Sequence, residues 1–453
     1  MNTARAASPW AWVPTLYFAE GLPYVAVMTV SLVLYKQMGL SNAEITFYTS
    51  WLYLPWVIKP LWSPLIDLAK TKRWWIVSME LLVGAAFGGV AFTLHTETWL
   101  QNTLFFFWVM AFSSATHDIA ADGFYMIGMD QHRQTLFVGI RSTFYRLATI
   151  FGQGFLVMAA GNLQVLFRDR IAYTWSLVFY GMAGLFIALW LYHCCVLPRT
   201  EEKGKGHGER TEEGDGAEKA SPEARPERER DARPAHGSLG RLGRLLLSFV
   251  TKMPAKETAV AILFMLLYRM PEGLLVKVSS LFLIDSGSAG GMGLSPQEYG
   301  LVQGTVGVIG LTLGGIAGGM AAARDGLKRW LWPMALAITL PDVVYIFLSN
   351  CLASPLPVVN VCVFVEQFGY GFGFTAYMLF LIYYSRGAYS TSHYAICTAF
   401  MALSMMLPGL FAGALQEAMG YRSFFVMVMV LCAVTWIVTA LVKVDPDFGK
   451  KEE

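Results

Sequence analysis

Two aspartates and a histidine interrupt a long apolar stretch of this chain. His117, Asp118 and Asp122 fall within residues 103–128, TLFFFWVMAFSSATHDIAADGFYMIG. An ionisable side chain at the centre of a bilayer costs roughly 2.5–3.5 kcal/mol even on the most lenient insertion scales. Asp118 and Asp122 are four residues apart and share one helix face, where two carboxylates in a low dielectric do not both ionise readily. We therefore interpret the pair as a candidate proton carrier, with a structural hydrogen-bonded or gate-closing pair as the alternative.

Basic side chains near this stretch are candidate partners of the two aspartates. Arg141 and Arg146 lie in the next apolar segment, and a buried guanidinium requires an anionic partner such as one of these aspartates or a substrate carboxylate. Arg146 is the stronger candidate, since Arg141 could extend to the membrane interface. His117 lies about 100° around the helix from Asp118 and could assist proton transfer. A hydrogen bond to a neighbouring helix is the favoured role for this histidine.

Further acids and bases occur in the first and second halves of the chain. Glu20 and Glu272 occupy matching places, and each is followed by glycine, which loosens a membrane helix where it borders a cavity. Arg269 and Glu272 are three residues apart, so they could pair across one helical turn, and we favour a neutralised structural pair. Lys277 and Glu366 complete this set in the second half.

Aromatic residues near these charged positions are candidates for stacking on sugar rings. For each one singly, packing between helices or a place in the interfacial aromatic belt is the favoured interpretation. The candidates are Tyr24, Phe124, Tyr145, Tyr268 and Tyr377.

The composition favours an integral membrane protein over a soluble one. The chain has 453 residues, of which 55% are hydrophobic and 15% charged. A net charge of +2 gives no indication of a nucleic-acid partner. The seven histidines are scattered and form no H-E-x-x-H or similar set, so we expect neither a metal site nor an enzyme. The N-terminus MNTARAASPW lacks the features of a removable signal peptide.

Apolar stretches of about 20 residues predict twelve spans, six on each side of a polar break. The predicted spans are residues 13–35, 44–65, 75–94, 103–127, 136–158, 173–196, 257–284, 297–320, 329–349, 356–384, 392–414 and 421–442. The fold class is therefore an all-α membrane protein with two six-helix bundles, residues 1–198 and 257–453. Residues 199–238 contain no aromatic residue, leucine, isoleucine or valine and predict a solvated linker. Residues 239–252 are basic and amphipathic, either on the membrane surface or leading into span seven; the whole linker region is 199–256.

The distribution of lysine and arginine predicts that both termini and the linker are cytoplasmic. In that orientation the short inner segments hold twelve basic residues: Arg5, Lys70, Lys72, Arg73, Arg133, Arg324, Lys328, Arg329, Arg386, Lys443, Lys450 and Lys451. The outer loops hold four: Lys36, Arg168, Arg170 and Arg422.

The two halves repeat several sequence features. Each has Glu-Gly-Leu early in its first span, then Gly-Leu-Ser and an acid in the following outer loop. Each also has an aspartate, Asp67 or Asp325, at the inner end of a span before basic residues and tryptophan. We interpret these aspartates as parts of an inner gate. Two six-span repeats indicate bundles that rock against each other around a central site.

Motifs distributed over both bundles carry a resemblance to a known family. They are LWSPLID (61–67), SSATHDIAAD (113–122), FYRLATIFGQG (144–154), LLYRMPE (266–272), GLSPQEYGLVQGTVGVIGLTLGGIAGG (293–319), EQFGYGFGFTAY (366–377) and STSHYAI (390–396). The chain resembles the major facilitator superfamily and, within it, the AmpG-type muropeptide permeases and related acetyl-CoA transporters. It departs from the usual family pattern at His117, where glutamine is common, and after Asp67 and Asp122.

The resemblance implies a secondary transporter of the inner membrane that imports anhydromuropeptides by alternating access. The proton gradient would supply the energy, without a cofactor, and we expect a monomer. Asp118 is the expected proton carrier because it lies deeper than Asp122, which we expect to pair with an arginine near the inner gate. Another organic anion or acyl-coenzyme A is the alternative substrate. A non-transporting receptor or a membrane-embedded enzyme is the alternative of another class.

Overall fold

Helices are the only regular secondary structure in the part of the chain that the structure describes. The computed structural model describes residues 8–129, 131–168, 170–199, 247–387, 390–446 and 448–449. Within these ranges, nine helices or runs of helices are long and apolar enough to cross a membrane. The predicted all-α membrane fold is confirmed. The predicted linker, residues 199–238, lies outside the described residues apart from Arg199.

The helices of the N-terminal half run lengthwise and end in short turns. They are α1 (Pro9–Val25), the π-helical segment η1 (Ala26–Val30), α2 (Ser31–Gln37), α3 (Asn42–Trp51), α4 (Leu54–Ala69), α5 (Lys72–Thr93), α6 (Trp99–Gly128), α7 (Gln131–Thr149), the π-helical segment η2 (Ile150–Leu156), α8 (Val157–Leu166) and α9 (Ile171–Val196).

The C-terminal half has a similar series of helices with more internal breaks. They are α12 (Ala255–Leu267), α13 (Met270–Ile284), the 3-10 turn η3 (Gly287–Ala289), α14 (Pro296–Leu301), the π-helical segment η4 (Val302–Gly307), α15 (Val308–Asp325), α16 (Leu327–Thr339), the 3-10 turn η5 (Leu340–Asp342), α17 (Val343–Asn350), α18 (Leu356–Ser385) and α19 (Ser390–Leu441).

Each of the twelve predicted spans overlaps one of these helices or a run of them. The span predicted at 44–65 is divided between α3 and α4, and residues 392–442 form the single element α19. The backbone of α19 is broken at Gly420, whose φ of 76° lies in the left-handed region. The described helices are therefore consistent with twelve spans. Before α12, residues 247–251 are helical and Phe249 is buried against Tyr384, so this short piece leads into span seven.

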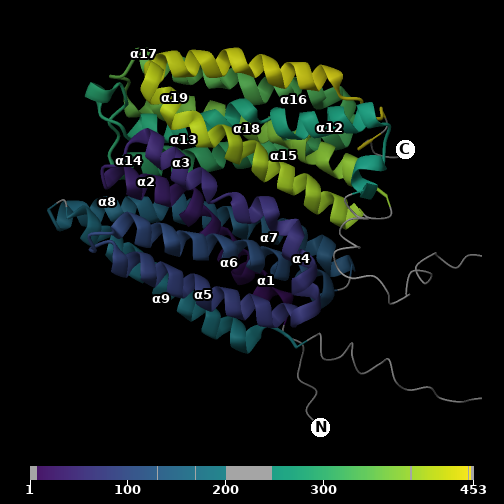
Figure 1. Ribbon diagram of the computed structural model, residues 1–453, viewed down its shortest axis with the longest axis horizontal. Helices are drawn as coiled ribbons and strands as arrows, with labels where there is room; N and C mark the ends of the chain where they lie inside the picture. Colours follow the sequence, from purple (N-terminus) through teal and green to yellow (C-terminus); the bar gives the residue numbers. More distant parts are fainter. Residues whose placement is uncertain are drawn as a thin grey trace, which may run out of the picture.

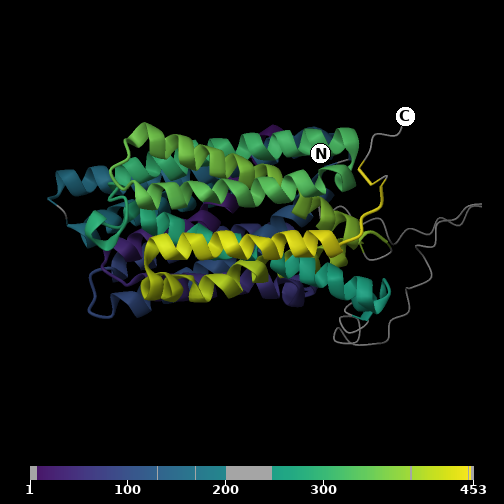
Figure 2. The ribbon, with the colours of Figure 1, turned by 90° about the horizontal axis from the view of Figure 1, so that it is seen from above.

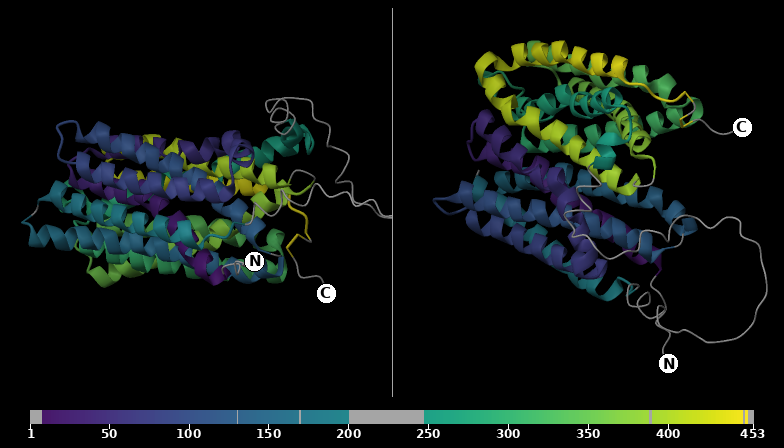
Figure 3. Two further views of the ribbon diagram at one scale, coloured as in Figure 1. Left: turned by 90° about the horizontal axis from the view of Figure 1, so that it is seen from below. Right: turned by 45° about the vertical axis from the view of Figure 1, so that its right-hand side comes forward.

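The two halves form two groups of roughly parallel helices. Figure 1 shows the N-terminal group in purple and blue beside the C-terminal group in green and yellow. The chain ends lie at the same end of the molecule, as the view from above in Figure 2 also shows. Figure 1 labels α2 and α14 at the opposite end, and the right-hand view of Figure 3 again shows the two groups beside each other. We call this opposite end the far end.

The second span of each half begins with the same local structure. Ser41 and Ser295 each accept a hydrogen bond from the backbone N–H three residues later, and Glu44 and Glu298 bind back to the serine N–H. These are capping boxes, which satisfy backbone donors at a helix start. Each follows a glycine with positive φ, 90° at position 39 and 69° at position 293. The repeated Gly-Leu-Ser sequence is thus a repeated turn and helix start.

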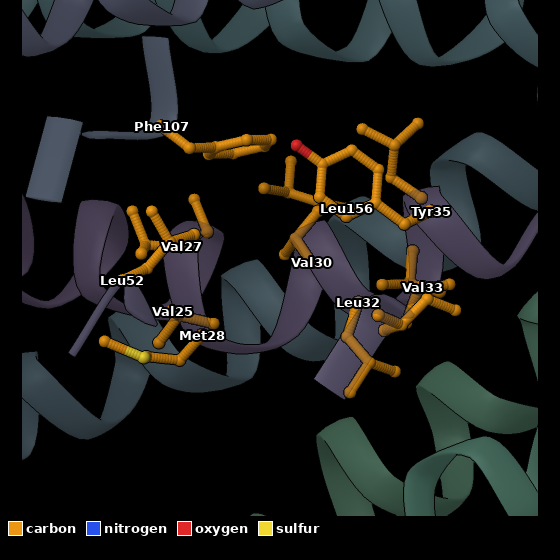
Figure 4. Packing of buried hydrophobic residues seen from close by; sticks show 14 of the residues in the cluster. Val25, Val27, Met28, Val30, Leu32, Val33, Tyr35, Leu52, Phe107 and Leu156 are labelled. Carbon is orange, nitrogen blue, oxygen red and sulfur yellow. The ribbon is translucent and has the colours of Figure 1, made fainter. Parts of the chain in front are cut away.

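The largest apolar cluster joins the two halves toward the far end. It contains the end of the first span, where Figure 4 shows Val27, Val30 and Tyr35 close to Phe107. It also includes residues of α13 and the second part of α19 from the other half. Two smaller clusters are confined to one half each and lie toward the chain ends. Apolar packing therefore holds the halves together at the far end.

Polar contacts between the halves occur at the same end. The Lys36 ammonium lies 2.5 Å from Oδ1 of Asp285, and the Asn42 side-chain amide lies 3.0 Å from Oδ2 of the same carboxylate. Asn42 is also 2.7 Å from Gln416 Oε1 and 2.9 Å from the Tyr421 hydroxyl. We call these five residues the far-end lock. Four of them are buried, so the far end is closed in this structure.

Candidate functional site

Three carboxylates meet between α1 and α6 in the N-terminal half. One oxygen each of Glu20, Asp118 and Asp122 lies within 4.8 Å of the other two. We call these residues the N-terminal acid cluster. Glu20 is buried, whereas the side chains of Asp118 and Asp122 are 21% and 36% exposed. The structure therefore brings together three carboxyls that the sequence placed on two different spans.

Both aspartates of this cluster have a cation. Lys59 of α4 contacts Asp118 directly, and the Arg141 guanidinium of α7 lies 3.0 Å from Asp122. The Tyr17 hydroxyl also donates to Asp122 over 3.2 Å. Glu20 has no such cation, and its Oε2 is buried without a hydrogen-bond partner in the described structure. The cluster thus has three carboxyl groups but only two directly bound cations among the described residues.

The sequence left open which arginine reaches Asp122. The structure shows Arg141 in contact with Asp122, whereas Arg146 forms no ion pair with any described acidic residue. The Arg141 guanidinium also lies 4.6 Å from the ring centre of Tyr17, which holds it toward the cluster. Our preference for Arg146 is thus not supported by this geometry. Lys59 was overlooked, although a single lysine inside the apolar span 44–65 was a visible signal.

His117 points away from the N-terminal acid cluster. Its Nε2 lies 3.3 Å from Oε1 of Glu80 on α5, and that same oxygen is 2.6 Å from Nδ1 of His193 on α9. Thr15 contacts the other nitrogen of His193 over 2.9 Å. Glu80 and the two histidines are almost fully buried. This group is a hydrogen-bonded contact between neighbouring helices, the role favoured for His117.

A second group of three carboxylates lies within the C-terminal half. One oxygen each of Glu272, Asp342 and Glu366 lies within 4.8 Å of the other two. We call these residues the C-terminal acid cluster. Asp342 was not anticipated, and it lies in the 3-10 turn η5 that interrupts the ninth span. Glu366 accepts hydrogen bonds from the Tyr345 hydroxyl and the Gln367 amide.

The predicted ion pair between Arg269 and Glu272 is not formed between these two described side chains. Arg269 lies at the break between α12 and α13, with φ −106° and ψ 10°, so the two residues do not follow each other on one regular helix. The guanidinium instead donates to the Tyr370 hydroxyl and lies 4.6 Å from the ring centre of Phe374. This part of the sequence interpretation was wrong because the helix break was not foreseen.

Lys277 reaches across to the N-terminal half. Its ammonium donates to the hydroxyls of Thr49 and Ser50, each over 2.8 Å, and lies 5.4 Å from the ring centre of Tyr53. The residue is buried, and no described carboxylate pairs with it. It is therefore a buried amino group whose described partners are all neutral.

The five aromatic candidates fall into two groups. Phe124 packs edge-on against Trp12, and Tyr268 stacks on Tyr377 with ring centres 5.7 Å apart. All three candidates are fully buried, so as placed they are packing residues. Tyr24 and Tyr145 are only partly buried.

Tyr24 and the charged residues of the two halves face each other across the midline. Tyr24 lies edge-on to Trp56 and within electrostatic range of Arg269 from the other half. Tyr394 of the C-terminal half similarly lies within electrostatic range of Asp122. The partial exposure of Asp118 and Asp122 is therefore found where the halves meet. This arrangement presents cations, carboxylates and tyrosines to one central region.

The predicted gate residues lie toward the chain ends. Asp325 closes α15 and accepts from the indole of Trp330 over 3.0 Å and from Arg329 over 3.1 Å. It is thus engaged within its own half. Asp67 lies in the last turn of α4, and its side chain lies outside the described residues.

Comparisons with known proteins agree with this architecture. A family model described as the BT1 family matches residues 18–444. The chain is 22% identical to the putative transporter AmpG 4 of Rickettsia felis, covering 92% of both chains. It is 24% identical to the anhydromuropeptide permease of Escherichia coli K12, covering 94% of this chain and 78% of that protein.

A solved structure shows the same fold. The crystal structure of the nucleoside transporter NupG, as a D323A mutant, matches with a TM-score of 0.67 and 14% identity, covering 95% of this chain and 99% of that one. At 14% sequence identity, this structural similarity shows the fold alone. The family match extends over nearly the whole chain, so the protein belongs to the BT1 family and is a multi-pass membrane protein with the fold of major facilitator transporters.

Proposed function

We propose that the protein is a proton-coupled secondary transporter that imports anhydromuropeptides across the inner membrane by alternating access. The names of its relatives support this substrate, since one of them is an anhydromuropeptide permease. The observation that carries the mechanism is the N-terminal acid cluster, in which three carboxylates have only two directly bound cations. An ionisable group at membrane depth is expensive unless it is paired, protonated or solvated.

The excess carboxyl of this cluster is Glu20. Asp118 and Asp122 each have a cation, whereas Glu20 is buried and one of its oxygens has no described partner. A carboxyl beside two other carboxylates in a dry environment is neutral when a proton is available. We therefore assign the transported proton to Glu20, with Asp118 and Lys59 as the pair that senses its charge. This replaces Asp118 as the leading candidate for the carrier.

Basic side chains at the midline suit an anionic substrate. The described partners of Lys277 are all neutral, and Arg269 is held by Tyr370 and aromatic rings instead of a carboxylate. An anion beside Lys277 would favour its protonated form. Peptide carboxylates of a muropeptide fit such groups, and Tyr24 and Tyr145 offer faces for its sugar ring. The same two basic side chains favour a second candidate, another organic anion such as an acyl-coenzyme A.

The closed far end fits the inward-facing state of such a transporter. Both chain ends lie at the opposite end, which the excess of lysine and arginine predicts to be cytoplasmic. Rocking of the halves would break the far-end lock and expose the central region to the periplasm. Each half keeps its own acid cluster during this motion.

Uptake into proteoliposomes tests the proposal. Labelled anhydromuropeptide should accumulate when the outside is acidic, and free sugar or nucleoside should not compete. Glu20→Gln should strongly lower proton-driven accumulation but leave counterflow exchange of substrate measurable, because the neutral amide mimics a permanently protonated carboxyl. Accumulation that is equal with and without a pH gradient would contradict proton coupling. Competition by acyl-coenzyme A but not by muropeptide would favour the second candidate.

A further inference from the structure

The C-terminal acid cluster is buried more deeply than its N-terminal counterpart. Glu272 and Asp342 are 4% exposed and Glu366 is 2% exposed. These residues come from α13, η5 and α18, which are otherwise apolar where they pack. Three carboxylates within 4.8 Å are therefore shielded from solvent.

The groups around this cluster supply almost no compensating charge. The Tyr345 hydroxyl and the Gln367 amide donate to Glu366, and the Cys432 thiol lies 3.9 Å from Asp342. All of these are neutral donors. Glu272 faces the cluster with Oε2 buried and without a hydrogen-bond partner among the described groups.

Arg269 is the single described cation within electrostatic range of Glu272, and it is engaged elsewhere. Its guanidinium donates to Tyr370 and lies against Phe374. Its Nε is buried without a partner. The N-terminal acid cluster, in contrast, has two cations in direct contact with carboxylates.

Three adjacent negative charges without a bound cation are not stable in a dry interior. Desolvation and mutual repulsion both favour the neutral form of a carboxyl. We propose that Glu272, Asp342 and Glu366 form a second proton-binding site of this transporter. Glu366 accepts from both a hydroxyl and an amide, whereas Asp342 accepts only from a thiol at 3.9 Å and Glu272 Oε2 has no described partner, so Glu272 and Asp342 hold the protons.

The position of Arg269 suggests how this site releases its proton, a step that rests on the proposed transport function. Arg269 precedes Glu272 by three residues at a helix break, and in this structure its guanidinium is bound to Tyr370 and lies against Phe374. While Arg269 stays there, Glu272 has no directly bound cation and the site retains its proton. A rearrangement that brings Arg269 to Glu272 during transport favours the ionised carboxylate, and the proton passes to water.

Infrared spectroscopy of the purified, substrate-free protein tests the site without a transport assay. The absorption band of the carbonyl stretch of protonated carboxylic acids should be present near neutral pH. Its intensity should be lower in Glu272→Gln and in Asp342→Asn. Asp325→Asn is the matched control, because Asp325 is an ion-paired carboxylate and its loss should leave this band unchanged. An unchanged band in both cluster variants would overturn the proposal. So would a band that disappears when sodium is added, since the cluster would then bind a metal cation.

Transport provides the second measurement. If the site carries one proton per cycle, Glu272→Gln should lower the steady-state accumulation ratio about tenfold at a pH gradient of about one unit. An unchanged ratio would show that protons in the cluster are not transported. If the infrared band responds as expected while no muropeptide is transported, the proton site stands and the proposed substrate fails. If accumulation is proton-driven but the infrared band is unchanged in the cluster variants, the proposed transport function stands and the second proton-binding site fails.

Discussion

Lys59 is one of the two cations bound directly to the N-terminal acid cluster. It lies on α4, and its ammonium contacts Asp118 while both side chains remain 21% exposed. Removal of one partner of a buried pair typically costs about 3–5 kcal/mol, and partial exposure reduces this penalty. The pair is therefore partly a structural contact and partly a charge sensor next to Glu20.

We predict that Lys59→Met lowers both stability and uptake. Asp118 then lacks its cation and must take up a proton, so the free energy of unfolding should fall by about 1–3 kcal/mol. Thermal unfolding in detergent and initial uptake rates in proteoliposomes measure the two effects. The double variant Lys59→Met with Asp118→Asn should recover most of the stability but not the uptake. Equal stability of the single and double variants would show that the pair contributes nothing as a pair.

The buried group around Glu80 should behave differently. Glu80 binds both His117 and His193, and neither histidine contacts the acid clusters. We predict that Glu80→Ala destabilises the protein by about 3–5 kcal/mol, because two buried imidazoles lose their acceptor. Transport per folded molecule should remain near that of the wild type.

Glu80→Gln is the matched variant, since its side chain has the same length and keeps one acceptor oxygen. It should be less destabilising than Glu80→Ala by thermal unfolding. Loss of proton-driven accumulation in well-folded Glu80→Gln would instead place this group in the proton pathway.

Sequence reasoning identified the carboxyls of the site better than their partners. Asp118, Asp122, Glu20, Glu272 and Glu366 were recognised because an acid in an apolar run is costly wherever it points. Partners depend on how helices rotate against each other, which spacing along one chain does not determine. Lys59 and Asp342 are charges inside predicted spans that the same criterion could have identified, whereas the partners of Arg269 and Asp122 depended on helix rotation.

At the scale of elements, the helices were predictable and their irregularities were not. Apolar length gave the spans, and the repeated Gly-Leu-Ser sequence marks matching helix starts at Ser41 and Ser295. The π-helical segments η2 and η4 and the break at Arg269 depend on packing against other helices. Sites of this kind often coincide with function.

The contact between η2 and η4 leaves no room for a side chain. A Cβ on Gly304 would lie 2.3 Å from the backbone of Gly154 in the other half. We predict that Gly304→Ala keeps the halves apart at this contact and strongly reduces uptake. The probe is a disulfide between Asn162→Cys and Gln297→Cys, because the native side chains are 3.2 Å apart across the two halves. In the presence of Gly304→Ala this disulfide should form several-fold more slowly than without it.

Gly319→Ala is the control for this experiment. Gly319 lies further along the same span in α15, and a Cβ there meets nothing within 4 Å. This variant should cross-link and transport like the wild type. Normal cross-linking in Gly304→Ala would mean that the helices shift to accept the methyl group without opening.

At the scale of the whole molecule, the structure is asymmetric between its two ends. Apolar packing and the far-end lock join the halves at one end, while the other two apolar clusters stay within one half each. Transport requires that the far end also opens. The lock therefore contributes to the equilibrium between the far-end-closed and far-end-open states. The free energy by which it favours the closed state should be small enough for binding of substrate and protons to shift this equilibrium.

Weakening the lock should shift the molecule toward the state that is open at the far end. Asp285 is the buried acceptor for both Lys36 and Asn42, so Asp285→Asn removes the ion pair while keeping the size of the side chain. The probe is Ser280→Cys, at a buried position on the same helix, in a background whose six native cysteines are replaced. An impermeant thiol reagent added outside intact cells should label it about tenfold faster in Asp285→Asn, equivalent to about 1.4 kcal/mol lost from the closed state.

Two controls make this last prediction decisive. Asp325→Asn, at the opposite end, should leave the labelling rate unchanged. Ala289→Cys lies in an exposed turn of the far end and should react from outside in every variant, because the distribution of lysine and arginine predicts that this end is periplasmic. If Ala289→Cys is protected in intact cells, the orientation is wrong. If it reacts while Ser280→Cys is labelled at the same rate with and without Asp285→Asn, the ion pair does not hold the far end closed, and the remaining hydrogen bonds of Asn42 and apolar packing around Phe282 and Tyr421 must do so.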